Sequence, residues 1–365
     1  MLVLKTCRIP ICQLTERCRL NPNTLSLERC TLPRPNTPDS PLPYSQGGNL
    51  QDFRLACFQF QLRLHGSLEL PPYKGASFHG ALGLALAKIG TRFRDFFYQP
   101  TPPAHWQALH QKPPKPYILI PPLDEQTHYQ AGDTLDLSLV LYGPAIDYLL
   151  IIFAALEHLG EYMGLGKQRG HFCVERINQI SPYGVRSLYQ NNRWVGQSQA
   201  LHVAQFFAAP SAVAQLRLKH TTRLRLKTAN DLLRTAPPFG LLMHRLLGRI
   251  NSLATLYGSG IVITPEEKQH LLALADTVTI EHSSLEWHDW QRYSQRSQST
   301  MSFGGLLGET VYTGELGPFV PWLALGQWVG VGGKTSFGLG LYELAGLTAD
   351  VAPQAGPNNP PGIYL

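Results

Sequence analysis

The stretch GVGGKTSFGLGLY at residues 330–342 is the most informative part of the chain. Its first eleven residues hold five glycines around a Lys-Thr-Ser. Glycine leaves backbone N–H groups free of side-chain cover, so a phosphate chain can approach them closely. A nucleotide-binding loop needs a glycine five residues before Gly333, and Trp328 stands there instead. The stretch therefore favours contact with a phosphate backbone and is not a nucleotide-binding loop.

Length and charge indicate a globular protein with a polyanionic partner. A chain of 365 residues, 44% of them hydrophobic, is long enough for two domains that each bury a core. Lys and Arg outnumber Asp and Glu by 31 to 25, giving a net charge of +6. There is no run of eighteen consecutive apolar residues and no signal-peptide pattern at the N-terminus. We therefore expect a cytoplasmic protein that does not interact with a membrane.

The first fifty residues differ from the rest. They contain Cys7, Cys12, Cys18 and Cys30, of which only the first two come close to the spacing of zinc ligands. They are also rich in Pro, Asn and Ser and show no hydrophobic periodicity. We expect residues 1–50 to be an irregular extension, without a metal site.

The first half of the remaining chain alternates between strand and helix signals. Residues 55–64 alternate as a strand, and a helix of about fifteen residues follows Pro71-Pro72. The segment 100–122 is rich in Pro and aromatic residues and favours a loop or the start of a strand. Residues 134–141 predict a strand, Gly143-Pro144 begins a long helix, and residues 171–174 begin another strand. This order is the split βαβ pattern of a ferredoxin-like domain, which we assign to residues 51–205.

The second half repeats the pattern. Residues 216–227 predict a long strand, and a helix follows from Pro238 to Tyr257. Two further regions of sheet, a helix over 319–328 and the glycine-rich loop complete a second ferredoxin-like domain, assigned to residues 206–347. Residues 348–365 are rich in Pro and Gly and are expected to be disordered. The fold class predicted is α+β, with two tandem ferredoxin-like domains and a glycine-rich loop at 330–340.

The long strand carries cations on one face. Because side chains alternate along a strand, its leucines at even positions lie on one face and its odd positions on the other. The odd positions are Arg217, Lys219, Thr221, Arg223, Arg225 and Lys227. Five cations with no acid among them favour contact with phosphates, and the alternative is an ordinary solvated face.

Five segments together resemble a known family. They are Leu70–Gly83 (LPPYKGASFHGALG), Met163–Phe172 with its glycine turns, Thr222-Arg223-Leu224, Trp290–Ser294 (WQRYS) and Met301–Gly308 (MSFGGLLG). With the glycine-rich loop, their order and spacing are similar to the CRISPR-associated endoribonuclease family numbered six. That family belongs to the RAMP superfamily of RNA-binding proteins, which are built from ferredoxin-like domains. The resemblance covers most of the chain from residue 51.

The resemblance implies a reaction and a partner. Members bind precursor CRISPR RNA and cut it once per repeat without a metal or other cofactor. The 2′-hydroxyl attacks the adjacent phosphate and leaves a 2′,3′-cyclic phosphate and a 5′-hydroxyl. Some RAMP proteins bind guide RNA without cutting it, as subunits of CRISPR effector complexes, so a non-catalytic subunit is the alternative. A serine hydrolase is disfavoured, because the chain has no Gly-x-Ser-x-Gly elbow.

Candidate residues for the two tasks follow from these segments. Proton transfer needs groups such as histidine, and phosphorane charge needs cations. His79 is the first candidate for proton transfer, in the first turn of its helix where the family often has Arg. The further catalytic candidates are Tyr73, Lys74 and His171. The candidates for RNA binding are Arg217, Lys219, Arg223, Arg225, Lys167, Arg169, Gly332, Gly333, Lys334, Thr335 and Ser336.

Overall fold

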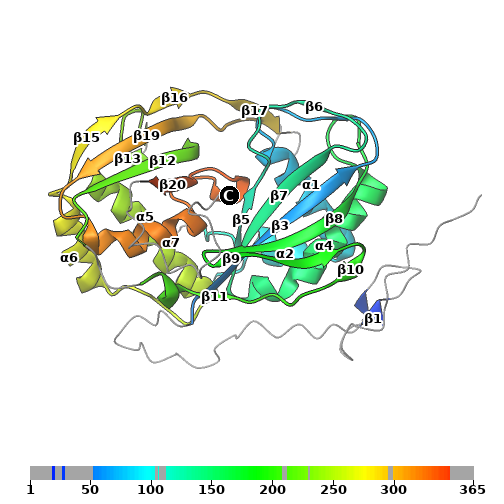
Figure 1. Ribbon diagram of the computed structural model, residues 1–365, viewed down its shortest axis with the longest axis horizontal. Coiled ribbons are helices and arrows are strands. Elements are labelled where there is room, and N and C mark those ends of the chain that lie inside the picture. The colour runs from blue at the N-terminus through cyan, green and yellow to red at the C-terminus, as the bar shows by residue number, and fades with distance from the viewer. Residues whose placement is uncertain are drawn as a thin grey trace, which may run out of the picture.

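The computed structural model shows two α+β units side by side (Figure 1). It describes residues 52–102, 106, 112–207, 212–228, 231–294 and 299–345, together with the backbone of a short strand pair, β1 (Arg19–Leu20) and β2 (Leu27–Glu28). The four N-terminal cysteines and the predicted tail 348–365 lie outside the described residues.

The first unit is built on an antiparallel sheet whose central strands have the order β8-β3-β7-β5. These strands are β3 (Arg54–Leu64), β5 (Tyr117–Ile120), β7 (Thr134–Tyr142) and β8 (Phe172–Ser181). Outer strands β9 (Gly184–Gln190), β10 (Arg193–Trp194) and β11 (Leu201–His202) extend it, and β4 (Leu68–Glu69) pairs with β6 (His128–Tyr129). The order fourth, first, third, second strand is that of the ferredoxin-like fold, so the predicted fold of this half is confirmed.

Helices cover one face of this sheet. They are α1 (Gly75–Ile89), α2 (Thr91–Tyr98) and α4 (Leu149–His158), which follows the 3-10 turn η2 (Gly143–Tyr148) and ends in the π-turn η3 (Leu159–Met163). Phe58 and Phe60 of β3 pack on this side with Leu82 of α1. Leu55 and Cys57 point to the opposite side and pack with the core of the second unit. Because its side chains alternate between the two faces of the sheet, β3 contributes to two hydrophobic cores.

Within the described residues one helical stretch, Gly143–Met163, is long and apolar enough by composition to cross a membrane. Its most apolar window is 61% buried inside the protein, and Ile152 and Leu156 belong to the core of the first unit. Its hydrophobicity is explained by packing on the sheet.

The second unit repeats the topology with the strand order β15-β19-β12-β20. The strands are β12 (Gln215–Leu224), β15 (Thr279–Ser283), β19 (Gly305–Thr313) and β20 (Tyr342–Ala345), and β16 (Glu286–His288) also pairs with β19. Helices α5 (Phe239–Tyr257), α6 (Pro265–Ala275) and α7 (Val320–Val329) accompany the sheet. Two small hairpins complete it, β13 (Lys227–Thr228) with β14 (Asp231–Leu232), and β17 (Gln291–Ser294) with β18 (Ser299–Ser302).

Both halves thus have the predicted α+β ferredoxin-like topology. Two helices, α2 and α6, were not predicted, and the predicted strand 216–227 stops at Leu224. The two sheets fall within the ranges assigned to the two domains, whose boundaries stay predictions.

Candidate nucleic-acid interface and active site

The glycine-rich loop lies where the two units meet. Gly338 has φ 88°, and a Cβ there would lie 2.6 Å from the carbonyl oxygen of Leu119 in β5. Gly333 donates its amide to the carbonyl of Arg225 at 2.9 Å, and Gly340 donates to that of Arg223 at 3.1 Å. The glycines therefore let the loop backbone pack closely between β5 and the end of β12. The predicted row of uncovered amides is corrected in part, because these amides already have protein acceptors.

The start of α1 is fixed to this loop. Tyr73 donates its phenolic O–H to the carbonyl of Phe337 at 2.7 Å, and its ring packs edge-on against Trp290. Burial raises the pKa of the Tyr73 phenol, partly offset by Arg223, whose guanidinium lies 5.5 Å from the ring centre. Tyr73 therefore keeps its proton at neutral pH and holds α1 against the loop.

The start of α1 and the glycine-rich loop together form the joint between the two units, and His79 lies in the middle of it. Its side chain is 7% exposed, and its ring centre lies 3.9 Å from that of Phe337. Nδ1 lies 3.1 Å from the carbonyl oxygen of Ser336 and 3.0 Å from the hydroxyl of Tyr117. Tyr98 donates to the backbone carbonyl of His79 at 2.5 Å. The imidazole therefore contacts both units and two phenols.

Lys115 approaches the other ring nitrogen of the same histidine. Its Nζ lies 3.2 Å from His79 Nε2 and 4.4 Å from the ring centre of Tyr98. Its position is fixed from the second unit, because Tyr257 at the end of α5 donates to the carbonyl of Pro114 at 2.6 Å. Sequence reasoning missed Lys115, although a lysine between two prolines just before a strand is a rigid and noticeable position.

The contacts of the imidazole define its protonation. A lysine ammonium has only donors, so Nε2 of His79 accepts from Lys115. A carbonyl oxygen has only acceptors, so Nδ1 carries the proton and donates to Ser336. Burial raises the pKa of the neighbouring phenols of Tyr98 and Tyr117, which therefore stay neutral. The arrangement places a neutral imidazole lone pair next to a cation.

Of the other catalytic candidates, Tyr73 lies at this joint, whereas Lys74 and His171 are not positioned for proton transfer there. Lys74 is fully buried, donates to the carbonyls of Pro72 and Asp124, and forms a 3.1 Å ion pair with the Asp124 carboxylate. Its ammonium cannot reach an RNA, so its prediction as a proton carrier is corrected to a structural role. Lys74 instead anchors the chain before α1 to the loop after β5.

His171 belongs to another part of the first unit. Phe172, which follows it, pairs with Leu64, whereas Tyr117 aligns through Leu141 with Ala56 at the start of β3. Eight residues of strand, about 26 Å at 3.3 Å per residue, separate these two positions. Lys167 and Arg169 are exposed on the turn before His171, where Lys167 lies 3.6 Å from Glu69. These three residues therefore form a group separate from His79.

The predicted cationic face of β12 divides into two parts. Lys219 is paired with Glu309 on one neighbouring strand and with Glu343 on the other, and Arg217 lies 3.8 Å from Glu309. Side chains of paired residues share a face, so acids balance this outer part. The expectation of a face without acids is corrected here, because the acids come from other strands.

The inner part of the face lies at the joint. Arg223 stacks on Tyr73, and its buried Nε has no hydrogen-bond partner within the described residues. Arg225 donates to the carbonyl of Gly304. Burial lowers the pKa of both guanidinium groups, which indicates cations held away from water.

Lys334 and its neighbours complete the charged part of the joint. Lys334 has φ 62°, donates to the carbonyl of Ser302 at 2.5 Å, and lies 3.9 Å from the ring centre of Phe303. Burial, and then the charge of Arg225, lower the pKa of Lys334 to about 8. Thr335 is buried, and Ser336 presents its carbonyl to His79. Lys334 and Lys115 therefore lie on segments that contact the imidazole, and Arg223 and Arg225 lie on the strand to which the glycine-rich loop is hydrogen-bonded.

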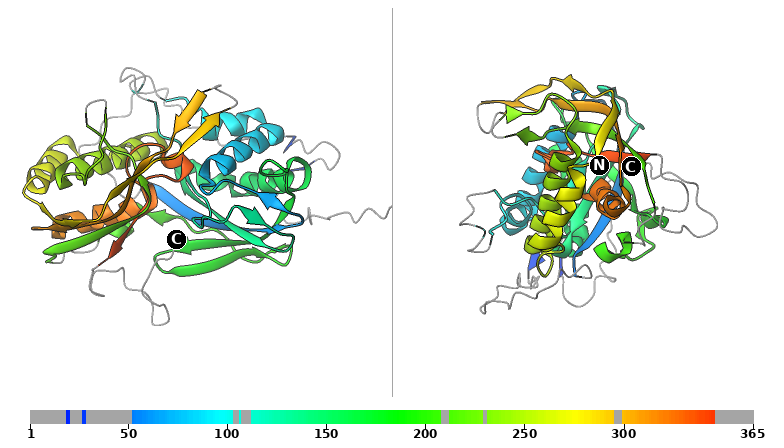
Figure 2. Two further views of the ribbon diagram at one scale, coloured as in Figure 1. Left: turned by 90° about the horizontal axis from the view of Figure 1, so that it is seen from above. Right: turned by 90° about the vertical axis from the view of Figure 1, so that its left-hand side faces the viewer.

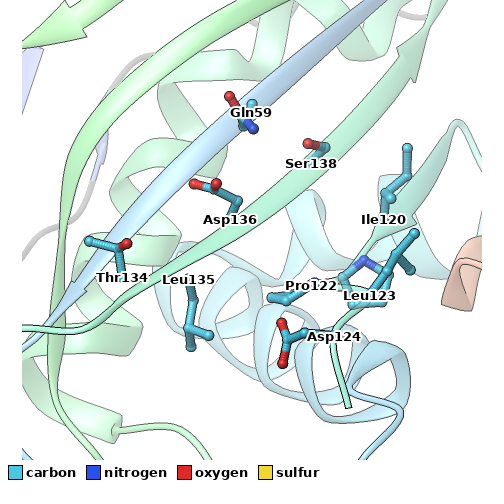
Figure 3. A pocket seen from close by; sticks show the side chains of 10 residues that line it. Gln59, Ile120, Pro122, Leu123, Asp124, Thr134, Leu135, Asp136 and Ser138 are labelled. Carbon is cyan, nitrogen blue, oxygen red and sulfur yellow. The ribbon is translucent and has the colours of Figure 1, made fainter. Parts of the chain in front are cut away.

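A hollow on the open face of the first sheet is lined by carboxylates instead of cations (Figure 3). Asp124 and Asp136 line it together with neutral polar side chains such as Gln59 and Ser138. Burial raises the pKa of Asp136, and the ion pair to Lys74 occupies the Asp124 carboxylate. Carboxylates repel phosphates, so this hollow is not part of the candidate interface.

Comparisons with known proteins show similarity in sequence and in fold. Residues 216–342 match the family model described as CRISPR-associated endoribonuclease Cas6, and residues 53–203 match a model described as an N-terminal domain. The second unit of the chain is therefore similar to the Cas6 family. The Cas6 match ends at Tyr342, so it includes the whole glycine-rich loop.

Solved Cas6 structures share the fold. Thermus thermophilus Cas6 superimposes with a TM-score of 0.50 at 17% identity, over 80% of this chain and 98% of that one. A partial Cas6-RT-Cas1–Cas2 complex gives a TM-score of 0.55 at 16% identity, over 80% of this chain and 46% of the other. An uncharacterized protein of Archaeoglobus fulgidus is 26% identical over 309 residues, which is 80% of this chain and 99% of that protein. The predicted α+β fold with ferredoxin-like domains is thereby confirmed.

Proposed function

We propose that this protein is a metal-independent endoribonuclease that binds precursor CRISPR RNA and cuts it within each repeat. The observation that carries the proposal is the position of the His79 imidazole, with Nδ1 3.1 Å from the carbonyl oxygen of Ser336 and Nε2 3.2 Å from the ammonium of Lys115. The Cas6 family and the cations on the surrounding segments support RNA as the substrate.

The proposed reaction uses groups at the joint. Nε2 of His79 accepts the proton of the 2′-hydroxyl as its oxygen bonds to the adjacent phosphorus. The bond from phosphorus to the 5′ oxygen breaks, and that oxygen takes up a proton from water, leaving a 2′,3′-cyclic phosphate and a 5′-hydroxyl. Lys115, which donates to Nε2 without RNA, turns to the phosphate and offsets the negative charge of the phosphorane. Arg223 and Arg225 hold neighbouring phosphates.

Burial of His79 favours a second candidate function. At 7% exposure, and packed on Phe337, the imidazole also suits a purely structural contact between the two units. In that case the protein is a non-catalytic RAMP subunit that holds guide RNA, with other effector subunits as partners.

One experiment separates the two functions. The protein is incubated with a labelled CRISPR repeat RNA in EDTA, and both retention and cleavage are measured. Endoribonuclease activity predicts a single cut, with an upstream product that resists 3′-end ligation until its cyclic phosphate is removed. Retention without cleavage would support the subunit, and an affinity no higher than for random RNA would contradict both.

A further inference from the structure

A second group of cations lies on helices α5 and α6, which pack side by side (Figure 2). Arg245 is exposed on α5, three residues before Gly248, and the Lys268 ammonium of α6 lies 3.7 Å from where a Cβ on Gly248 would be. Because Gly248 has no side chain, Lys268 can lie across α5 near Arg245. This contact brings together two cations from different helices.

The group is connected to the joint between the two units. Arg245 donates to the carbonyl of Lys227 at 2.8 Å, and Lys227 is exposed. Two residues before Lys227, Arg225 forms a backbone bridge with Gly332 of the glycine-rich loop. Cations therefore follow one another from Lys334 through Arg225 and Lys227 to α5 and α6.

The cations in this group, Lys227, Arg245 and Lys268, form no ion pair within the described residues. Burial and then Arg245 lower the pKa of Lys268, and burial, Lys268 and Arg245 lower that of His244 on the same surface. Of the acids at the start of α6, Glu267 is occupied in capping Thr264. Cations that lie close together without ion pairs are stabilised by an anionic ligand.

We propose that Lys227, Arg245 and Lys268 form a second phosphate-binding surface, which takes single-stranded RNA that flanks the repeat segment held at the joint. The identity of the ligand rests on the proposed function, because a precursor RNA continues beyond the site of cleavage. The cations between the joint and this surface favour RNA over an acidic protein. A polyanion that is bound at the joint can continue along these cations, whereas an acidic protein need not bind at the joint.

The test compares two RNAs and two double variants. One RNA is a repeat alone, and the other carries an added single-stranded flank of uridines on either side. Arg245→Glu with Lys268→Glu reverses the charges of the surface. Arg186→Glu with Arg193→Glu changes the net charge equally at exposed positions of β9 and β10. Thermal midpoints establish that each variant is folded.

We expect the flank to increase the affinity of the parental protein, and the α5/α6 variant to lose about tenfold of that advantage. Its salt dependence with the flanked RNA should fall by roughly 0.7 in log–log slope for each phosphate that the surface no longer binds. The control variant should keep the advantage of the flank. Equal losses of affinity in both variants would show an effect of net protein charge alone. An unchanged gain in affinity from the flank in the α5/α6 variant would exclude RNA at this surface. Either result overturns the proposal. A parental protein that binds flanked RNA by this surface but never cuts it would overturn only the catalytic function.

Discussion

The imidazole Nδ1 of His79 lies 3.1 Å from the carbonyl oxygen of Ser336, a residue 257 positions later in the chain. A side chain of the first unit and the backbone of the second therefore meet at one hydrogen bond. Lys115 and Tyr117, from the segment leading into β5, contact the same ring. Any movement of the two units relative to one another would change the position of the group proposed to move a proton.

Replacing His79 by alanine tests its chemical role. We expect single-turnover cleavage of repeat RNA to slow by roughly 10²–10⁴-fold, because proton transfer from the 2′-hydroxyl is lost. Affinity should stay within a few-fold, since phosphate contacts dominate RNA binding. The pH–rate profile should also lose its acidic limb, which reports protonation of the imidazole. Parallel loss of binding and cleavage would instead identify His79 as a packing residue.

Removing the charge of Lys115 should affect the chemical step more than binding. Lys115→Met should lower the rate at saturating RNA by about 10²-fold, because the phosphorane charge is no longer offset. Lys115→Arg should restore part of that rate. Lys112→Met, which removes the same charge from an exposed position three residues earlier, serves as the control. A rate equal to that of the parental protein would remove Lys115 from the proposed site.

The two parts of the β12 face should differ in RNA binding. Arg223→Glu with Arg225→Glu should weaken repeat-RNA binding and reduce the salt slope by roughly 1.4, corresponding to two single-strand phosphate contacts. Arg217→Glu with Lys219→Glu should have a smaller effect, because Glu309 and Glu343 already balance those cations. Fluorescence anisotropy at several salt concentrations measures both. The same slope change in both variants would show that the whole face binds RNA.

The fold was predictable from local patterns, whereas the site was predictable only in part. The periodicity of β3, α1 and α5 is a property of short segments, and two repeats of the same order indicate the topology. Helix α6 was missed, although Thr264 and Glu267 form a capping box that marks its start. Its polar surface weakens the hydrophobic stripe on which the prediction relied.

Contacts between distant segments explain the remaining differences. Alternation along β12 was identified correctly, but Glu309 and Glu343 come from strands far away in the sequence. Lys115 meets His79 only because β5 packs beside α1 and Tyr257 holds Pro114. The two prolines beside Lys115 mark a rigid position, but nothing local to Lys115 or to the two acids shows which residues they meet.

Substitution of Gly338 tests the close packing of the loop. Alanine would have to adopt φ 88°, and its Cβ would lie 2.6 Å from Leu119 O. We expect a loss of roughly 1–3 kcal/mol in the free energy of unfolding, with a parallel loss of cleavage as Ser336 moves from His79. Gly66→Ala, where a Cβ meets nothing within 4 Å, should change neither. Denaturant unfolding measures the first effect, and an unchanged midpoint for Gly338→Ala would show that the loop adapts.

The buried imidazole of His220 predicts how stability depends on pH. It lies in β12 beside the ring of Tyr342, and neither ring nitrogen has a hydrogen-bond partner within the described residues. Burial lowers the pKa of His220 to about 4, so between about pH 6.5 and 4 the unfolded chain binds a proton that the folded protein does not. Stability contributed by the neutral form is therefore present above pH 6.5 and is lost as the pH falls, by about 2 kcal/mol between pH 7 and pH 5. His220→Leu should remove this part of the pH dependence and should not lower stability at pH 7, because the substitution breaks no hydrogen bond. Urea unfolding at both pH values measures the difference, with the exposed His282→Gln as control. If His220→Leu keeps the parental pH dependence, or unfolds more easily at pH 7, His220 has a polar partner in solution.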